Sequence, residues 1–218
     1  MMLIKIVVPW RKHFYNYLRK KIKLMKNSTA IVLIVLALIV LVGGCNSYNG
    51  FVDKDQNVES TWAKVQSAYQ RRADLIPNLV NTVKGYADFE KSTLTAVVNA
   101  RAKATSVNID ASKLTPESFK KFQNAQAGLS SALSKLLVTV ERYPDLKANQ
   151  NFLELQSQLE GTENRIKVAR DKFNDAVKSY NVTVKKFPSN LYAGLFGYRA
   201  KPYFEADKGT EKAPEVKF

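Results

Sequence analysis

The sequence has very few of the side chains on which most catalytic and metal sites depend. It contains one cysteine, Cys45, and one histidine, His13, among 218 residues. If the chain is cut before Cys45 and lipid is attached to its sulfur, the mature protein has no histidine and no free thiol. Such a chain cannot form a Ser-His-Asp triad, a Cys-His pair or a histidine-based zinc site, nor a disulfide within one chain. We therefore expect a protein that is not an enzyme and that uses no metal or cofactor.

Acidic residues are absent before Asp53, whereas eight lysines and arginines precede the apolar run that begins at Ala30. After Cys45 the chain has 26 basic and 19 acidic residues, so much of the formal net charge of +15 lies in the leader. A basic segment before an apolar run places the rest of the chain outside the cytoplasm. Binding to nucleic acid is not expected, because the aromatic residues fall on apolar helix faces and no nucleic-acid-binding signature is present.

Thirteen apolar residues run without a break from Ala30 to Val42, and Cys45 follows closely. As a helix this run would be about 20 Å long, which is short for a bilayer core of about 30 Å. The length suits the apolar region of a signal peptide. Small residues before a lone cysteine resemble the bacterial lipoprotein signal, which predicts cleavage at Cys45 and lipidation of its sulfur. The alternative is that the leader is retained as a transmembrane anchor.

The sequence divides into four parts. Residues 1–44 form the leader, and within it residues 1–24 are interpreted as untranslated, because Met25 begins a signal peptide of ordinary length. The remaining parts are a tether at 45–52, a helical bundle domain at 53–205 and a flexible tail at 206–218. The part after the leader is long enough for one domain with its own hydrophobic core.

Apolar residues recur at spacings of three and four along most of the domain, which predicts amphipathic helices. The first helix is expected at about 53–72. Asp74 can cap a second helix that begins near Leu75, extends to about Ala104 and tolerates Pro77 in its first turn. The alternative is one long helix that is kinked at Pro77.

Two further helices carry long heptad seams. Thr115 and Pro116 provide the N-cap and the first residue of one helix, and the seam that follows is interrupted only by Gln126. The last helix is expected from about Ala148 to Phe187, where a proline follows. Short connections between successive amphipathic helices favour antiparallel neighbours. We therefore predict an all-α fold, an up-and-down antiparallel four-helix bundle with long helices, preceded by the N-terminal signal or membrane segment.

Several stretches of the domain resemble the LemA family of bacterial envelope proteins. They are RRADLIPNLV at 71–80 with its continuation at 83–86, LEGTENRI at 159–166, and three short segments between Phe187 and Glu205. The resemblance implies a four-helix bundle behind an N-terminal membrane segment, in a family without an established enzymatic activity. It also implies a connection with envelope stress and membrane-protein quality control. One departure is Phe89, where many members have a histidine, and it argues against any role that needs that histidine.

A first group of polar residues surrounds the expected junction between the first two helices. It consists of Arg71, Arg72, Asp74, Asn78 and Asn81. These residues could form a polar pocket that holds an anionic group through arginine forks and free N–H groups. We favour the interpretation that they form a capping and ion-pair network that fixes the turn between the helices.

A second group of polar residues lies on the last helix. It consists of Glu163, Asn164, Arg165 and Arg170. Glu163 and Asn164 are expected beside the core, because Thr162 and Ile166 belong to the apolar seam. A carboxylate with an amide and a guanidinium can carry out acid–base chemistry. We favour a buried polar network that fixes the register between helices.

The segment Leu191–Tyr198 is apolar and contains two glycines. It could be a docking patch for a partner or for the membrane surface. The alternative, which we favour, is that it folds back and covers the end of the bundle.

We therefore expect a membrane-anchored, non-catalytic helical bundle that is exposed in the bacterial cell envelope. It would reach the membrane through a lipid on Cys45 or through the N-terminal apolar segment. It would bind other envelope proteins by helix-on-helix association, as an accessory factor, and self-association is possible. The first alternative is a small-ligand or lipid binder that uses the junction pocket or a cavity near Trp62 and Leu79. The second is an envelope enzyme that acts with a partner protease.

Overall fold

The structure is a computed structural model that describes residues 7–86 and 90–205, with side chains from Ser28 onward. The prediction of an all-α fold is confirmed, since no strand occurs within these residues. The helices are α1 (Val7–Lys84), α2 (Lys91–Ser106), α3 (Pro116–Val140), α4 (Pro144–Lys147), α5 (Gln150–Lys185) and α6 (Ser189–Phe196), with a short 3₁₀ helix at Ala111–Lys113. The predicted tail at 206–218 and Phe89 lie outside the described residues.

The chain divides into two units, Met1–Asn49 and Gly50–Phe218, which are described separately. In the first unit, the side chains from Ile31 to Val42 are all exposed. The helix that contains them is long and apolar enough to cross a membrane, a criterion that a signal sequence near the N-terminus also meets. The thiol of Cys45 is free and exposed.

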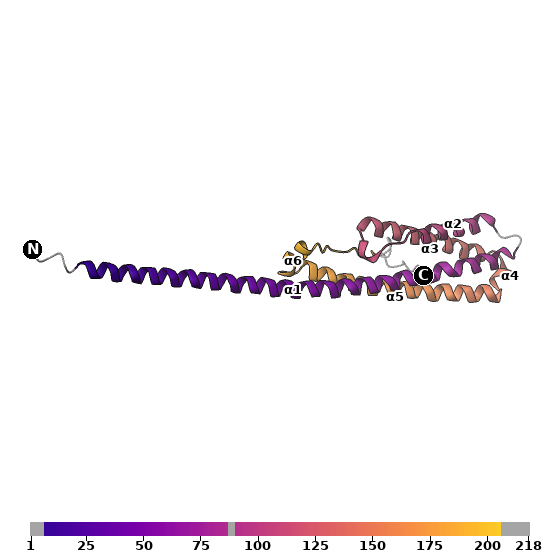
Figure 1. The fold of residues 1–218 in the computed structure, drawn as a ribbon. Coiled ribbons are helices and arrows are strands. Elements are labelled where there is room, and N and C mark those ends of the chain that lie inside the picture. The colour runs from indigo at the N-terminus through magenta and orange to yellow at the C-terminus, as the bar shows by residue number, and fades with distance from the viewer. Residues whose placement is uncertain (1–6, 87–89, 206–218) are drawn as a thin grey trace, which may run out of the picture. The chain divides into compact units, whose positions relative to one another are not determined.

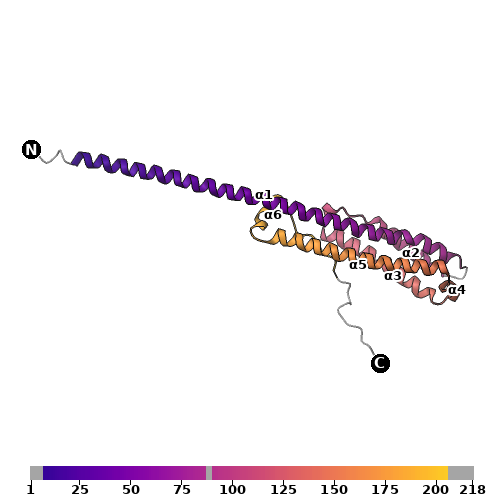
Figure 2. The same cartoon turned by 90° about the horizontal axis from the view of Figure 1, so that it is seen from below.

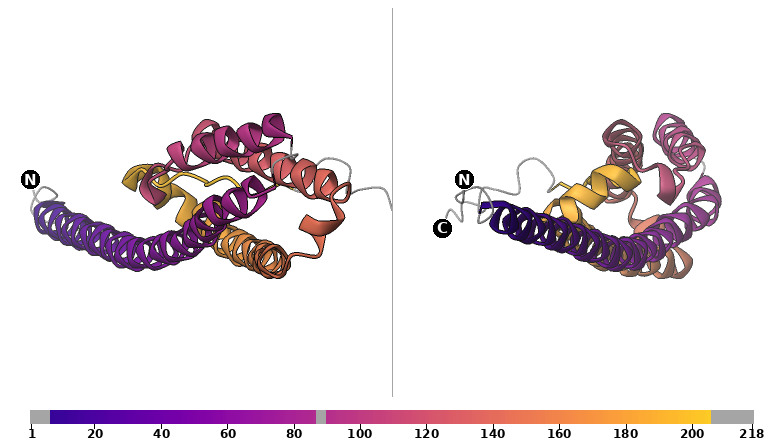
Figure 3. Two further views of the ribbon diagram at one scale, coloured as in Figure 1. Left: turned by 90° about the vertical axis from the view of Figure 1, so that its right-hand side faces the viewer. Right: turned by 60° about the vertical axis from the view of Figure 1, so that its left-hand side comes forward.

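In the second unit, which we call the domain, the long helices lie side by side (Figures 1 and 2). Helix α2 packs on α3, and α6 packs on α5. Helix α4 lies at one end of the domain and α6 lies at the other (Figures 1 and 2). Figure 3 shows the same helices from two further directions.

The predicted boundary between the first two helices is wrong, because α1 continues through this region with Pro77 inside it. Proline has no N–H group, so the carbonyl of Ala73 loses its usual donor within the helix. Nε of Arg101 in α2 donates to that carbonyl at 2.7 Å. Asp74 caps no helix and instead accepts from Nε2 of Gln70 at 2.7 Å. A contact from another helix thus replaces the bond that Pro77 removes, and α1 need not end there.

Other boundaries also differ from the sequence-based expectation. Helix α1 ends at Lys84 and α2 begins at Lys91, so the predicted second helix is divided in two. Residues 45–52 belong to α1 rather than to an irregular tether, and the side chain of Phe51 is fully buried. Six α-helices, two of them short, thus occupy the described chain, where the sequence analysis expects four long helices behind the leader.

The start of α3 and its apolar face agree with the prediction. Oγ1 of Thr115 accepts a hydrogen bond from the backbone N–H of Ser118 at 3.2 Å and so caps the helix. The seam residues from Phe119 to Val140 are buried, and so is Gln126. The periodicity of three and four residues therefore identified the face of α3 that packs in the core.

Aromatic side chains form the centre of one of the two hydrophobic clusters of the domain. The ring of Trp62 lies 5.2 Å from that of Phe122 and 5.3 Å from that of Phe173. Its indole Nε1 donates to the carbonyl of Ile109 at 3.0 Å, so the polar atom of this buried side chain is satisfied. Phe187, expected at the end of the last seam, is 74% exposed because it follows the end of α5.

The segment 199–205, which we call the C-terminal strap, is fixed along α5 by two asparagines. The side-chain amide of Asn181 donates to the carbonyl of Lys201 at 2.9 Å and accepts from its N–H at 2.8 Å. Asn174 makes the same two bonds with the backbone of Phe204, at 3.1 and 2.8 Å. The buried ring of Phe204 then lies 4.6 Å from that of Phe119. The strap thus completes the aromatic cluster.

Candidate functional site

Arg72 is the centre of a buried polar cluster in the domain. Its side chain is only 1% exposed. Nη1 donates to Oε1 of Glu163 at 2.7 Å and to Oγ of Ser130 at 2.8 Å. Nη2 donates to Oε1 of Gln126 at 2.8 Å. Two residues that the sequence analysis placed in separate groups, Arg72 and Glu163, therefore form one ion pair.

The cluster connects four helices. Arg72 lies on α1, Gln126 on α3 and Glu163 on α5. Nε2 of Gln126 donates to the carbonyl of Ala104 in α2 at 3.3 Å. Since Glu163 already neutralises the guanidinium, the cluster is suited to fix the register of the helices rather than to bind an anion.

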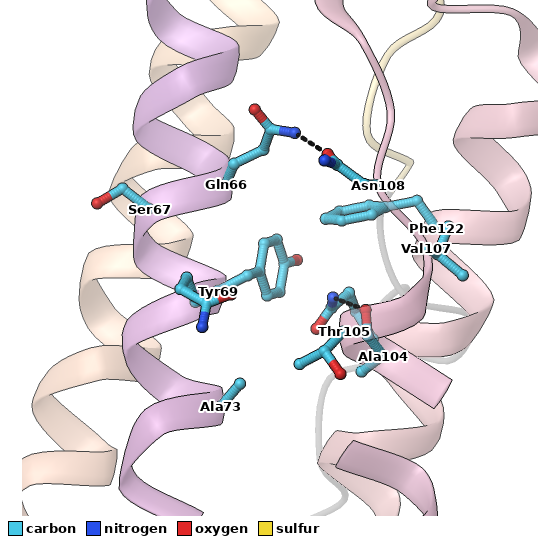
Figure 4. A pocket seen from close by; sticks show the side chains of 11 residues that line it. Gln66, Ser67, Tyr69, Ala73, Ala104, Thr105, Val107, Asn108 and Phe122 are labelled. Atoms are coloured by element: carbon cyan, nitrogen blue, oxygen red, sulfur yellow. Dashed lines mark hydrogen bonds between the residues drawn. The ribbon is translucent and has the colours of Figure 1, made fainter. Parts of the chain in front are cut away.

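Two cavities flank the Arg72 cluster. The first, shown in Figure 4, has a volume of about 360 Å³ and lies between α1 and the end of α2 with the segment that follows. Nε2 of Gln66 donates to Oδ1 of Asn108 at 2.9 Å across it (Figure 4). The second has a volume of about 390 Å³ and is lined by Arg72, Glu163 and Arg170. Nε of Arg72 has no hydrogen-bond partner within the described part of the chain.

A different surface, the α1–α5 groove, lies on the outside of the domain. It has a volume of about 640 Å³. Its lining comes from Ser60, Ala63, Lys64, Ser67, Ala68 and Arg71 on α1 and from Asn164, Arg165, Val168, Ala169 and Lys172 on α5. Small side chains on α1 leave the groove open, and Val168, which is 44% exposed, provides its largest apolar side chain.

Four cations line the α1–α5 groove and no carboxylate does. They are Lys64, Arg71, Arg165 and Lys172. The groove therefore combines an apolar floor with a positive rim. Such a surface is complementary in polarity and charge to a segment that presents apolar side chains flanked by acidic ones.

The predicted site residues thus divide between two places. The buried Arg72 and the half-exposed Glu163 belong to the Arg72 cluster, whereas Arg71, Asn164 and Arg165 line the α1–α5 groove. The difference arises because neighbouring residues on a helix point about 100° apart. Asp74, Asn78 and Asn81 are exposed on α1 and line neither the groove nor the two cavities.

Arg170 also has a different role from the one expected. Its guanidinium donates to the backbone carbonyl of Glu205 at 3.0 Å and lies 4.8 Å from the ring centre of Phe204. It therefore holds the C-terminal strap and lines one cavity.

Several residues of these sites cannot be predicted from the sequence pattern alone. Lys64, Val168 and Lys172 line the groove, but alone they look like ordinary surface residues of amphipathic helices. Gln126 did give a signal, because it interrupts an otherwise apolar seam. A polar residue in a seam implies a buried partner, and here the partner is Arg72.

The described side chains show no arrangement that points to metal chemistry. Among them, no group of three or more His, Cys, Asp or Glu lies together. The closest candidate for acid–base chemistry is Glu163, whose carboxylate is held by Arg72.

Comparison with known proteins identifies the family of the chain. The model of the LemA family matches residues 61–218. The magnetosome protein MamQ 1 of Paramagnetospirillum magneticum is 24% identical over 197 residues, covering 80% of this chain and 71% of the relative. Protein LemA of Metamycoplasma hominis is 27% identical over 140 residues, covering 64% of this chain and 57% of the relative. Because the family model spans well over half of the sequence, the chain belongs to the LemA family.

Proposed function

We propose that this LemA-family chain is a membrane-anchored, non-catalytic accessory protein of the cell envelope that binds other proteins through the α1–α5 groove. The long segments of α1, α2, α3 and α5 act together as an up-and-down bundle that carries this surface. The predicted anchor is a lipid on Cys45, and the alternative is the apolar helix near the N-terminus, retained as a transmembrane anchor.

The α1–α5 groove is the observation that carries this proposal. A groove between two helices with small side chains allows a third helix to approach closely. The apolar floor around Val168 would bury the apolar face of that helix, and the cations on both rims would pair with acidic residues beside it. The partner that fits best is an acidic amphipathic helix. Binding of such a helix in a groove is a recurring mode of peptide recognition.

Site-specific photocrosslinking tests the proposal. A photoreactive residue replaces Val168, which is 44% exposed in the groove, or Leu153, which is 43% exposed on α5 outside it. In native membranes we expect an adduct from position 168 and not from position 153. Mass spectrometry of the adduct should identify an acidic amphipathic segment.

Charge reversal supplies the control for this experiment. The double variant Arg71→Glu with Arg165→Glu should abolish the adduct without a change in thermal stability, because both side chains are exposed. Equal labelling from positions 168 and 153, or an adduct that survives charge reversal, would contradict the proposal.

The cavity of Figure 4 supports a second candidate function, the binding of a small polar ligand. Its volume of about 360 Å³ and its polar lining, which includes Gln66 and Asn108, are suited to such a molecule. Neither Trp62 nor Leu79 lines this cavity, the second cavity or the groove. Native mass spectrometry of the full chain should then detect a bound small molecule. The variant Thr105→Trp, which places a large side chain in the cavity, should lose that molecule. The same bound mass, or none, in both the original chain and the variant would exclude this function.

A further inference from the structure

We propose that α6 and Phe187, which lies two residues before α6 begins, form a wedge that binds the surface of an anionic bilayer. This interaction would hold the α6 end of the domain at the membrane. The inference is independent of the α1–α5 groove, because it concerns a different surface of the domain.

The wedge is unusually apolar for an exposed surface. Phe187 is 74% exposed, Leu191 is 65% exposed and Leu195 is 77% exposed. Leu191 and Leu195 are four residues apart in a helix and therefore lie on one face. An exposed apolar helix face beside basic residues is typical of a segment that lies in a membrane interface.

The opposite face of α6 fixes the wedge on the domain. Ala193 is 2% exposed and belongs to the aromatic cluster. Gly197 ends the helix in the left-handed conformation, with φ of 79°, and the N–H of Tyr198 donates to the carbonyl of Ala193 at 2.9 Å. Leu191 and Leu195 are therefore held outward by packing and do not fold over the end of the domain. The favoured interpretation from the sequence is that this segment folds back and covers the end of the bundle. Only the face of α6 that contains Ala193 packs on the domain.

Charge complementarity indicates an anionic surface. The segment 185–201 has four basic residues, Lys185, Lys186, Arg199 and Lys201, and no acidic residue. Lys201 is used by the domain, where it pairs with Asp55. Lys185, Lys186 and Arg199 are exposed beside the wedge. Basic residues next to an apolar face add electrostatic attraction to anionic lipids.

The covalent chain keeps the wedge within reach of the membrane. The apolar run ends at Val42, and nine residues further on the ring of Phe51 lies 4.9 Å from that of Tyr198, next to the end of α6. Nine residues span about 14 Å as a helix and at most about 32 Å when fully extended. A bilayer that holds the apolar run therefore lies close enough for α6 to bind it.

Fluorescence of a single label tests the wedge in the full chain. In a Cys45→Ser background, Leu195→Cys or Val138→Cys carries an environment-sensitive dye, since these positions are 77% and 71% exposed. The protein is reconstituted in vesicles of phosphatidylglycerol and phosphatidylcholine or of phosphatidylcholine alone. In the anionic vesicles we expect emission at shorter wavelength and quenching by spin-labelled lipids at position 195 and not at position 138.

A charge-reversal variant separates the wedge from a general effect of folding. Lys185→Glu with Lys186→Glu should reduce the shift at position 195 while the helical circular dichroism is unchanged. A dye at position 195 that is as hydrated as that at 138 would overturn the proposal. So would equal shielding in neutral vesicles, or shielding that appears only at high protein-to-lipid ratio, which would show that a second copy covers α6.

Discussion

Arg71 and Arg72 are adjacent in sequence, and the structure predicts opposite consequences when each is replaced by alanine. Arg72→Ala removes the donors of a buried cluster and leaves Oε1 of Gln126 without its partner inside the domain. An unsatisfied buried acceptor costs about 1–3 kcal/mol, and breaking a buried ion pair costs about 3–5 kcal/mol. Because Glu163 is 50% exposed and can be hydrated, we expect a loss near the lower end, about 3 kcal/mol.

Arg71 is exposed in the α1–α5 groove, so Arg71→Ala should change the free energy of unfolding by less than about 0.5 kcal/mol. The assay is urea denaturation of the full chain in detergent micelles, followed by circular dichroism. The pair Arg72→Met with Gln126→Leu should recover part of the lost stability, because no buried polar atom of Gln126 then lacks a partner, while the carbonyl of Ala104 loses its donor. Equal effects of Arg71→Ala and Arg72→Ala would refute the division of these residues between groove and cluster.

Three further predictions concern the elements around these sites. Arg101→Met should lower the free energy of unfolding by about 1–3 kcal/mol, because the carbonyl of Ala73 loses its donor. Pro77→Ala should reduce this loss, because alanine restores an intrahelical N–H. A double-mutant cycle measured by denaturation gives the coupling between the two positions, and additive effects would contradict the prediction. Asn181→Leu should speed hydrogen exchange at the amide of Lys201 and leave the amide of Phe204 protected, because Asn174 still holds Phe204. Equal acceleration at both amides would contradict this independence. Burial, and then the charge of Asp55, raises the pKa of Tyr180 to about 12. Since the unfolded chain loses this proton near pH 10, stability should decrease between about pH 10 and 12, and Tyr180→Phe should remove that part of the decrease.

Periodicity alone predicted much of the fold. The seam of α3 and its cap at Thr115 could be read from the sequence, because both depend on residues three or four positions apart. The continuity of α1 could not be read in this way. Local rules place a boundary near Pro77, and the donor that makes the boundary unnecessary is Arg101, on a different helix. A contact between distant residues thus outweighed a local preference.

The candidate site was predicted in composition but not in arrangement. Arg71 and Arg72 were grouped because they are adjacent, as were Glu163 and Asn164. In each pair one side chain belongs to the buried cluster and the other lines the groove. Which side chains point into the core depends on which face of the helix is buried. The sequence near Pro77 allowed either a boundary between two helices or one continuous helix, so the buried face could not be assigned. Once α1 is continuous, the separation of the pairs follows from helical geometry.

The sequence has no histidine after position 13, and a binding role remains the proposal. The structure adds surfaces to that proposal. The α1–α5 groove and the wedge at α6 are exposed, apolar in part and bordered by cations. The groove would provide the contact with a protein, and the wedge the contact with lipid.

The most direct test of this account is the identity of the segment that crosslinks to position 168 in native membranes. We expect one acidic amphipathic helix, absent from the reaction at position 153 and lost when Arg71 and Arg165 are both replaced by glutamate. A crosslinked segment without acidic residues, or the same product from both positions, would contradict it.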